Sequence, residues 1–274
     1  MTTPTIDQLR DTVDGAVVTP ADPGYDDART VYNAMIDRRP TVIVQATTST
    51  DVAAAVAFAR ENDLPIAMRG GGHSVPGFGT IDDGVVIDLG GMREVGVDPA
   101  RRVARAQGGA TWGDFNAATH EHSLATTGGI ISTTGVAGLT LGGGIGYLTR
   151  GHGLSCDNLV GAEVVTADGR IIRADADEHA DLLWALKGGS GNFGVATALE
   201  FRLHPLSDVY GGPMVFELEH ARDIFAWFRD FIVDAPEQFG GFPAFQIAPP
   251  LEFIPEDRHG DTFVVFVACW AGPL

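Results

Sequence analysis

The sequence predicts an α+β protein that contains one large domain and part of a second. Short apolar segments typical of strands are joined in some places by tight glycine-containing turns and in others by helices, without a regular strand–helix–strand alternation. The chain has 274 residues, 45% of them hydrophobic, which is enough to bury a sizeable core. Glycine accounts for 36 residues, roughly twice its average share of about 7%.

In the first half of the chain, residues 1–40 are expected to be helical and irregular. Thereafter, buried apolar runs predict strands, and Ser49-Thr-Asp51 marks the start of a helix. The expected order is strand 42–45, helix 52–61, strand 65–68, strand 84–89, a hairpin of 95–98 with 102–107, and a helix from Thr111 to about Glu121.

In the second half, a glycine-rich stretch over 127–153 comes first. A hairpin follows, and Asp168-Gly169 is a strong signal for its turn. The expected order is hairpin 160–166 with 170–173, helix 179–187, strand 195–203, strand 214–218, amphipathic helix 220–233, and apolar strand 263–270, which needs neighbouring strands. Pro205 marks a boundary, so we divide the chain into an N-terminal helical segment 1–37, a domain 38–206 and a partial domain 207–274.

The charge of the chain limits its partners. Asp and Glu total 36 against 18 Lys and Arg, a net charge of −18 that argues against nucleic acid or an anionic membrane as the main partner. The N-terminus has no basic region followed by an apolar one, and no apolar run reaches the ~18 residues of a membrane span, so we expect a cytoplasmic protein. Cys156 and Cys269 are accordingly expected to be reduced.

Glycine is concentrated in three clusters, at 70–72, 128–146 and 188–194. Backbone N–H groups of such segments can converge on an anion because no Cβ is in the way. Any single cluster is equally compatible with tight turns and close packing. Three clusters together favour a large, extended anionic ligand such as a dinucleotide.

The segment Gly189-Ser-Gly-Asn-Phe-Gly194 has the letters of a Rossmann fingerprint. That fingerprint follows a strand and opens a helix, whereas here a helix is expected before it and a strand after it. We therefore interpret it as a tight helix-to-strand turn, which disfavours a nicotinamide dehydrogenase. A Walker A motif is also excluded, because the only lysine, Lys187, lies in a different context.

Among the titratable residues, His73 directly follows three glycines in a loop after a strand. It could be solvent-facing or locally hydrogen-bonded, or it could act as a nucleophile, a base or a covalent tether. His120-Glu-His122 lacks the spacing of a helical zinc motif, so no metal site is expected. Trp112 and Trp184 are expected in the core.

The order of the motifs resembles a known family. Arg69-Gly-Gly-Gly-His-Ser-Val-Pro-Gly77, Gly135-Val-Ala-Gly138, Gly142-Gly-Gly-Ile-Gly146, Arg150-Gly-His-Gly-Leu154 and Gly191-Asn-Phe-Gly-Val195 are similar to the FAD-binding half of berberine-bridge-enzyme-like and 6-hydroxynicotine-oxidase-like oxidases, of the vanillyl-alcohol-oxidase (PCMH-type) superfamily. The resemblance spans roughly residues 20–206. It implies a PCMH-type domain of two α+β subdomains with FAD between them, followed by an antiparallel-sheet substrate cap.

The resemblance also implies a function and a site. The function is an oxidase that takes hydride from a C–H next to O or N of a small molecule onto flavin N5, with O2 as acceptor. His73 matches the histidine bonded to the flavin 8α-methyl group. The implied cofactor-binding residues are Arg69, Gly70, Gly71, Gly72, His73, Ser74, Gly77, Phe78, Gly128, Gly129, Thr133, Thr134, Gly135, Gly138, Gly142, Gly143, Gly146, Val165, Gly194 and Val195.

Two departures from the family qualify this expectation. Many members of the family carry a second covalent bond to the flavin, through a cysteine. The matching position in this sequence is Ile131, so we expect a covalent bond through His73 only. Cys156 is expected to have a packing role. The chain also holds only the start of the cap, so it is expected to be truncated and to lack the catalytic base. A partner chain could complete the cap; the alternative is a catalytically incomplete FAD-binding module.

Overall fold

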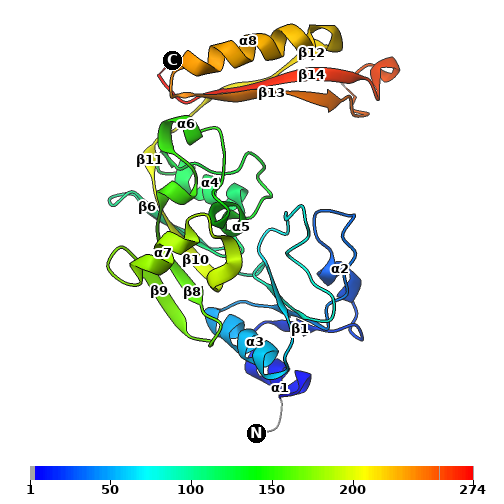
Figure 1. Cartoon of the computed structure of the whole chain (residues 1–274), viewed down its shortest axis with the longest axis vertical. Coiled ribbons are helices and arrows are strands. Elements are labelled where there is room, and N and C mark those ends of the chain that lie inside the picture. The colour runs from blue at the N-terminus through cyan, green and yellow to red at the C-terminus, as the bar shows by residue number, and fades with distance from the viewer. Residues whose placement is uncertain (1–3, 253, 274) are drawn as a thin grey trace.

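The computed structural model describes residues 4–252 and 254–273, which form an α+β fold as predicted. The N-terminal elements lie at one end of the molecule and a sheet with one long helix lies at the other (Figure 1). Between them stands a five-stranded antiparallel sheet with its helices. The division at 37/38 and 206/207 stays a prediction.

The first sheet is mixed, and its strands run in the order β1-β2-β4-β3. β2 (Val42–Gln45), β4 (Val85–Asp88) and β3 (Ile66–Arg69) are parallel, and β1 (Ala16–Val18) pairs with β2 in the antiparallel sense. The prediction contained no strand before residue 42, so β1 is a correction. It is an edge strand of three residues, too short to show an alternating pattern.

Helices α1 (Ile6–Thr12), α2 (Tyr25–Arg29) and α3 (Ser49–Glu61) accompany this sheet. α3 joins β2 to β3, and its buried alanines and valines pack on the sheet. Its N-cap is Thr48, one residue before the predicted start, because the Thr48 hydroxyl accepts a hydrogen bond from the Asp51 amide while Asp51 accepts one from the Thr48 amide.

The second sheet is antiparallel throughout, in the order β5-β6-β10-β8-β9. Both predicted hairpins are confirmed, as β5 (Val95–Asp98) with β6 (Val103–Gln107) and as β8 (Leu159–Val165) with β9 (Ile171–Asp175). β10 (Val195–Arg202) lies between the hairpins. The sheet is accompanied by helices α4 (Trp112–His120), α5 (Val136–Leu141) and α7 (Ala180–Leu186).

The core of this second unit is aromatic. Trp112, Phe115 and Phe201 are fully buried and meet edge to face, with ring centroids 5.2–6.1 Å apart. Trp112 is therefore in the core as predicted. Trp184 is not, because its side chain on α7 is 79% exposed while Leu183 and Leu186 occupy the buried face of that helix.

Glu163 of β8 links the two sheets. Its carboxylate accepts a hydrogen bond from the hydroxyl of Ser49, at the start of α3. It also accepts one from the Thr197 hydroxyl at 2.7 Å and one from the Arg105 guanidinium at 3.3 Å. Burial alone raises the pKa of Glu163, but these donors outweigh it, and the pKa lies below its ordinary value.

The C-terminal sheet is antiparallel, in the order β12-β14-β13, with helix α8 (Ala221–Asp234) packed on it. β12 (Tyr210–Glu217) and β14 (Thr262–Trp270) extend two predicted strands, whereas β13 (Phe239–Ile247) was missed. β14 is the central strand and finds its neighbours within the chain. The remaining elements are β7 (Leu124–Ala125), α6 (Thr149–His152), β11 (His204–Pro205) and the 3₁₀ turns Cys156–Asn158, Ser190–Phe193, Leu218–His220 and Glu256–Arg258.

Candidate functional site

The first glycine loop, residues 70–74, directly follows β3. Among the described residues, none of its five amide N–H groups donates a hydrogen bond, and all five residues are only half-buried. Gly72 has φ +70°, a conformation that favours glycine. A run of unpaired, convergent N–H groups is a backbone arrangement that binds anions.

The second glycine loop carries a similar run, residues 128–133, whose amides likewise donate no hydrogen bond within the described part of the chain. The two loops touch. A Cβ on Gly71 would lie 2.4 Å from the Gly135 nitrogen, and one on Gly135 would lie 2.5 Å from the Gly71 nitrogen. Glycine is thus required at both positions for the two backbones to approach each other.

His73 is held between the loops. Its Nε2 lies 3.0 Å from the Thr133 hydroxyl and its Nδ1 lies 3.3 Å from the Thr134 hydroxyl. The ring of Tyr32 stacks on the imidazole, with centroids 4.1 Å apart and planes inclined by 16°. The structure therefore brings together three of the predicted site residues, which are separated by 60 positions in the sequence.

Tyr32 is a neighbour of this site that sequence reasoning missed. It lies in the N-terminal segment, where no motif marks it, and its amide donates to the Gly72 carbonyl at 3.2 Å. Its ring is 71% exposed although it stacks on His73. No local pattern could have found it, because the contact depends on the tertiary packing of the segment around Tyr32 against the first loop.

The guanidinium of Arg69 has a role inside the fold. The side chain is buried, pairs with the Asp88 carboxylate at 2.7 Å and donates to the Thr30 and Ala28 carbonyls. These contacts neutralise its charge. Any anion between the loops would thus meet backbone amides rather than this guanidinium.

The remaining predicted residues take different positions. In the first loop, the Ser74 hydroxyl accepts from the Phe78 amide, and the Phe78 ring is 74% exposed. Val165 and Val195 pair across β8 and β10 with buried side chains, so only their backbone could meet a ligand. The glycines Gly138, Gly142, Gly143 and Gly146 lie in or just after α5, and Gly194 (φ +139°) ends the turn before β10.

The helix-to-strand interpretation of residues 189–194 is confirmed, because α7 precedes this segment and β10 follows it. Cys156 is buried and unpaired with Cys269, as expected for packing thiols. Ile131 is half-exposed beside the second run of amides.

A histidine pair lies behind the second loop. The rings of His152 (α6) and His204 (β11) stack with centroids 4.0 Å apart, and His204 Nε2 lies 2.7 Å from Asn158 Oδ1. Burial lowers the pKa of His152. Burial, followed by the charges of His152 and Arg202, lowers the pKa of His204.

This pair predicts a pH dependence of stability. Because both pKa values are depressed in the folded state, the unfolded chain binds more protons below about pH 6.5, and stability falls as the pH falls. Between about pH 7.5 and about pH 5.5, we expect the urea midpoint of the wild type to fall more than that of His152→Phe, which keeps an aromatic ring but does not titrate. Parallel pH profiles of the two proteins would contradict this prediction.

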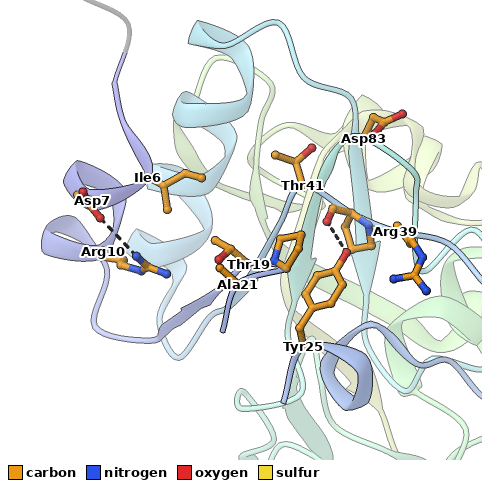
Figure 2. A pocket seen from close by; sticks show the side chains of 11 residues that line it. Ile6, Asp7, Arg10, Thr19, Ala21, Tyr25, Arg39, Thr41 and Asp83 are labelled. Carbon is orange, nitrogen blue, oxygen red and sulfur yellow. Dashed lines mark hydrogen bonds and ion pairs between the residues drawn. The ribbon is translucent and has the colours of Figure 1, made fainter. Parts of the chain in front are cut away.

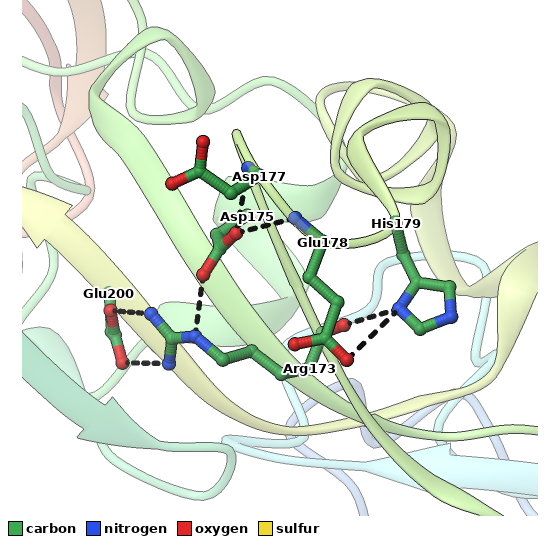
Figure 3. Close-up of polar contacts among 6 residues, drawn as sticks. All are labelled: Arg173, Asp175, Asp177, Glu178, His179 and Glu200. Atoms are coloured by element: carbon green, nitrogen blue, oxygen red, sulfur yellow. Dashed lines mark hydrogen bonds and ion pairs between the residues drawn. The ribbon is translucent and has the colours of Figure 1, made fainter.

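An ion-pair network anchors the start of α7 (Figure 3). Arg173 binds Glu200 in a bidentate manner, at 2.7 and 2.9 Å, and Asp175 at 2.6 Å. The Asp177 and Glu178 amides, followed by Arg173, lower the pKa of Asp175 to about 2. The network joins β9, β10 and α7 and is structural.

One hollow lies away from the loops, and a second reaches the second loop at Gly128 and Gly129. The larger, about 580 Å³, is lined by α1, Tyr25 and the segment around Arg39 (Figure 2). Its floor is apolar, and Tyr25 donates to the Pro40 carbonyl at 2.6 Å. The smaller, about 270 Å³, lies between the second sheet's unit and the C-terminal sheet, lined by Tyr147, Leu206 and Cys269 among others.

The described residues hold no group of three His, Cys, Asp or Glu side chains that could bind a metal ion. In the same part of the chain, no helix has the length and apolar character needed to cross a membrane.

Comparisons with known proteins identify the class. Residues 40–175 match the family model described as FAD binding domain. (R)-6-hydroxynicotine oxidase of Paenarthrobacter nicotinovorans is 38% identical over 194 residues, 71% of this chain and 42% of that protein. An uncharacterized FAD-linked oxidoreductase of Bacillus subtilis is 40% identical over 200 residues, 71% of this chain and 44% of that protein.

Solved structures agree. The crystal structure of 6-hydroxy-D-nicotine oxidase from Arthrobacter nicotinovorans superposes with a TM-score of 0.86 at 30% identity, covering 99% of this chain and 58% of that one. Physcomitrella patens BBE-like 1 gives a TM-score of 0.87 at 25% identity, covering 98% and 57%. The chain thus belongs to the FAD-linked oxidoreductases that share this FAD binding domain, and it spans less than half the length of the two curated relatives above.

The residues present fit such a cofactor. A Cβ on Gly71 or Gly135 would strike the backbone of the other loop, so glycine lets the two loops close on each other, and the unpaired amides of residues 70–74 and 128–133 lie beside this contact. Unpaired backbone N–H groups of this kind can bind a pyrophosphate. An imidazole stands beside the same contact in His73.

Proposed function

We propose that the chain binds FAD in an extended form across the two glycine loops, tethered through His73 alone, and serves as the cofactor-binding part of an oxidase. The observation that carries this proposal is that the unpaired amides of residues 70–74 and 128–133 belong to two segments whose backbones touch at Gly71 and Gly135, with His73 between them. Backbone dipoles can hold an anionic cofactor in a protein whose net charge is −18.

In this proposal the amides of the first loop hold the pyrophosphate and the second loop lies along the flavin. Gly194, with the backbone of Val165 and Val195, contacts the cofactor between them. When bound, the isoalloxazine supplies two-electron redox chemistry. The protein's own contribution is to orient the cofactor, with Thr133 and Thr134 fixing the plane of the imidazole.

In this proposal each of the three parts of the chain has its own role. Residues 38–206 form the cofactor domain, 1–37 brace it through β1 and Tyr32, and 207–274 begin a substrate cap. The substrate is a small molecule oxidised at a C–H next to O or N, with O2 as the acceptor, in the cytoplasm.

The second candidate is an FAD-binding module without activity of its own. It is favoured by one observation, that the chain spans 44% and 42% of two curated relatives. A partner chain that completes the cap would restore turnover if the chain is the cofactor-binding part of an oxidase. It would have no effect if the chain is an FAD-binding module without activity of its own.

The test is cofactor uptake. Purified protein incubated with FAD and passed through gel filtration should elute yellow, with close to one flavin per chain. Gly71→Ala places a Cβ against the Gly135 backbone and should lose the flavin, whereas Gly96→Ala, where a Cβ meets nothing within 4 Å, should keep it. A folded wild-type sample that takes up no FAD would refute the proposal.

A further inference from the structure

Residues 146–153, which include α6, contact the C-terminal sheet at several points. A Cβ on Gly240 of β13 would lie 2.1 Å from the Tyr147 carbonyl oxygen, and the Tyr147 and Phe242 rings are parallel within 7° at 6.4 Å. Gly151 packs on the backbone of Glu237, just before β13. In the chain, α5 separates this joint from the amides of residues 128–133.

Arg150 is the polar anchor of the joint. Its guanidinium donates to the Ile232 carbonyl at 3.0 Å and to the Ala235 carbonyl at 2.5 Å. Ala235 is the C-cap of α8, and the last carbonyls of a helix have no partner within the helix. A cation there also interacts favourably with the negative end of the helix dipole.

α6 is itself held in place by contacts with residues that follow it in the chain. His152, two residues after Arg150, stacks on His204, and Asn158 donates to the His152 and Leu154 carbonyls at 2.9 Å. The chain enters the C-terminal sheet only six residues after His204. The guanidinium therefore projects from a supported turn and binds the C-terminal end of α8.

We propose that Arg150 is a positioning residue that latches the C-terminal sheet in its closed place over the cofactor-binding part. The inference rests on the proposed function, because the sheet's position matters for reaction only if FAD lies along the second loop. Without the guanidinium, only apolar contacts and the linker hold the C-terminal sheet against α6. The sheet therefore separates from α6 more often.

The two cysteines of the chain report on this opening. Cys269 lies on β14 and lines the hollow at the joint beside Tyr147, whereas Cys156 lies in the cofactor-binding part. Both thiols are buried, and burial raises the pKa of each, so both react slowly in the closed protein. Opening of the joint exposes Cys269 and leaves Cys156 covered.

The experiment is thiol labelling followed by peptide mass mapping. In Arg150→Ala, Cys269 should be labelled about tenfold faster than in the wild type, equivalent to about 1.4 kcal/mol in the opening equilibrium, with Cys156 unchanged. Arg150→Lys, which can still reach a carbonyl, should rescue part of the difference. Arg229→Gln is the matched control, since Arg229 lies on α8 and, among the described residues, pairs only with Asp230.

A second readout tests the link to the cofactor. In FAD-loaded Arg150→Ala with undiminished flavin content, the fine structure of the visible flavin band should be lost as solvent enters. Unchanged Cys269 labelling would overturn the latch whether or not FAD binds. If Cys269 is labelled faster in Arg150→Ala but the flavin band is unchanged, the latch does not act on the cofactor. If Cys269 is labelled faster but the protein takes up no FAD, the proposed function is refuted and the latch stands.

Discussion

Replacing His73 by alanine is expected to abolish acid-stable flavin attachment completely. The imidazole is the only side chain that we assign to a covalent bond, and it is held in place by Thr133, Thr134 and Tyr32. Loss of the ring removes the nucleophilic nitrogen and leaves the amide rows intact. The variant should therefore still take up FAD, but release it on denaturation.

The measurement is the flavin absorbance of acid-precipitated, washed protein. The wild-type pellet should be yellow and the His73→Ala pellet colourless. Cys156→Ala is the control and should stay yellow, because Cys156 is buried and is not expected to bond flavin. A yellow His73→Ala pellet, or a colourless Cys156→Ala pellet, would show that another residue carries the bond.

The glycine loops could be predicted because their signal is local. Clusters of glycine, which mark segments whose backbone amides can stay free for a ligand, are visible in the sequence around Gly70 and Gly128 without knowledge of the fold. That the loops face each other at Gly71 and Gly135 depends on tertiary packing. Tyr32 was missed for the same reason, since its partner His73 lies about forty residues further on.

The errors elsewhere have physical reasons too. Trp184 was expected in the core, but Leu183 and Leu186 lie on the buried side of α7 and leave Trp184 on the exposed side. β13 contains Gly240, Gly241 and Pro243, residues depleted in strands, yet it pairs with β14 over its full length. Tertiary pairing overrode local preference there.

Replacing Asp51 by alanine is expected to lower the free energy of unfolding by about 3–5 kcal/mol. The Asp51 side chain is 2% exposed and accepts hydrogen bonds from the amides of Asp14, Gly15, Thr47 and Thr48, at 2.8–3.2 Å, and from the Thr47 hydroxyl. Alanine would leave these donors without an acceptor. It would also remove the bond that ties the chain before β1 to the start of α3.

The same carboxylate predicts a pH dependence. Burial alone raises the pKa of Asp51, but the amides of Thr47 and Asp14 outweigh it and bring the pKa below its ordinary value. Its contribution is therefore complete above the unfolded pKa of about 3.9 and is lost as the pH falls through the lower folded pKa. Urea unfolding between about pH 6 and about pH 3 should show a steeper loss for the wild type than for Asp51→Asn, which cannot ionise.

The control for this series is Asp7→Asn. Asp7 is exposed and pairs with Arg10 at 3.3 Å on the surface of α1, so its removal should change the free energy of unfolding by less than about 1 kcal/mol. An Asp51→Ala protein as stable as Asp7→Asn would contradict the assignment of Asp51 as the residue that organises the junction of β1 and α3. It would also weaken the view that residues 1–37 brace the cofactor domain, because that brace depends on the same contact.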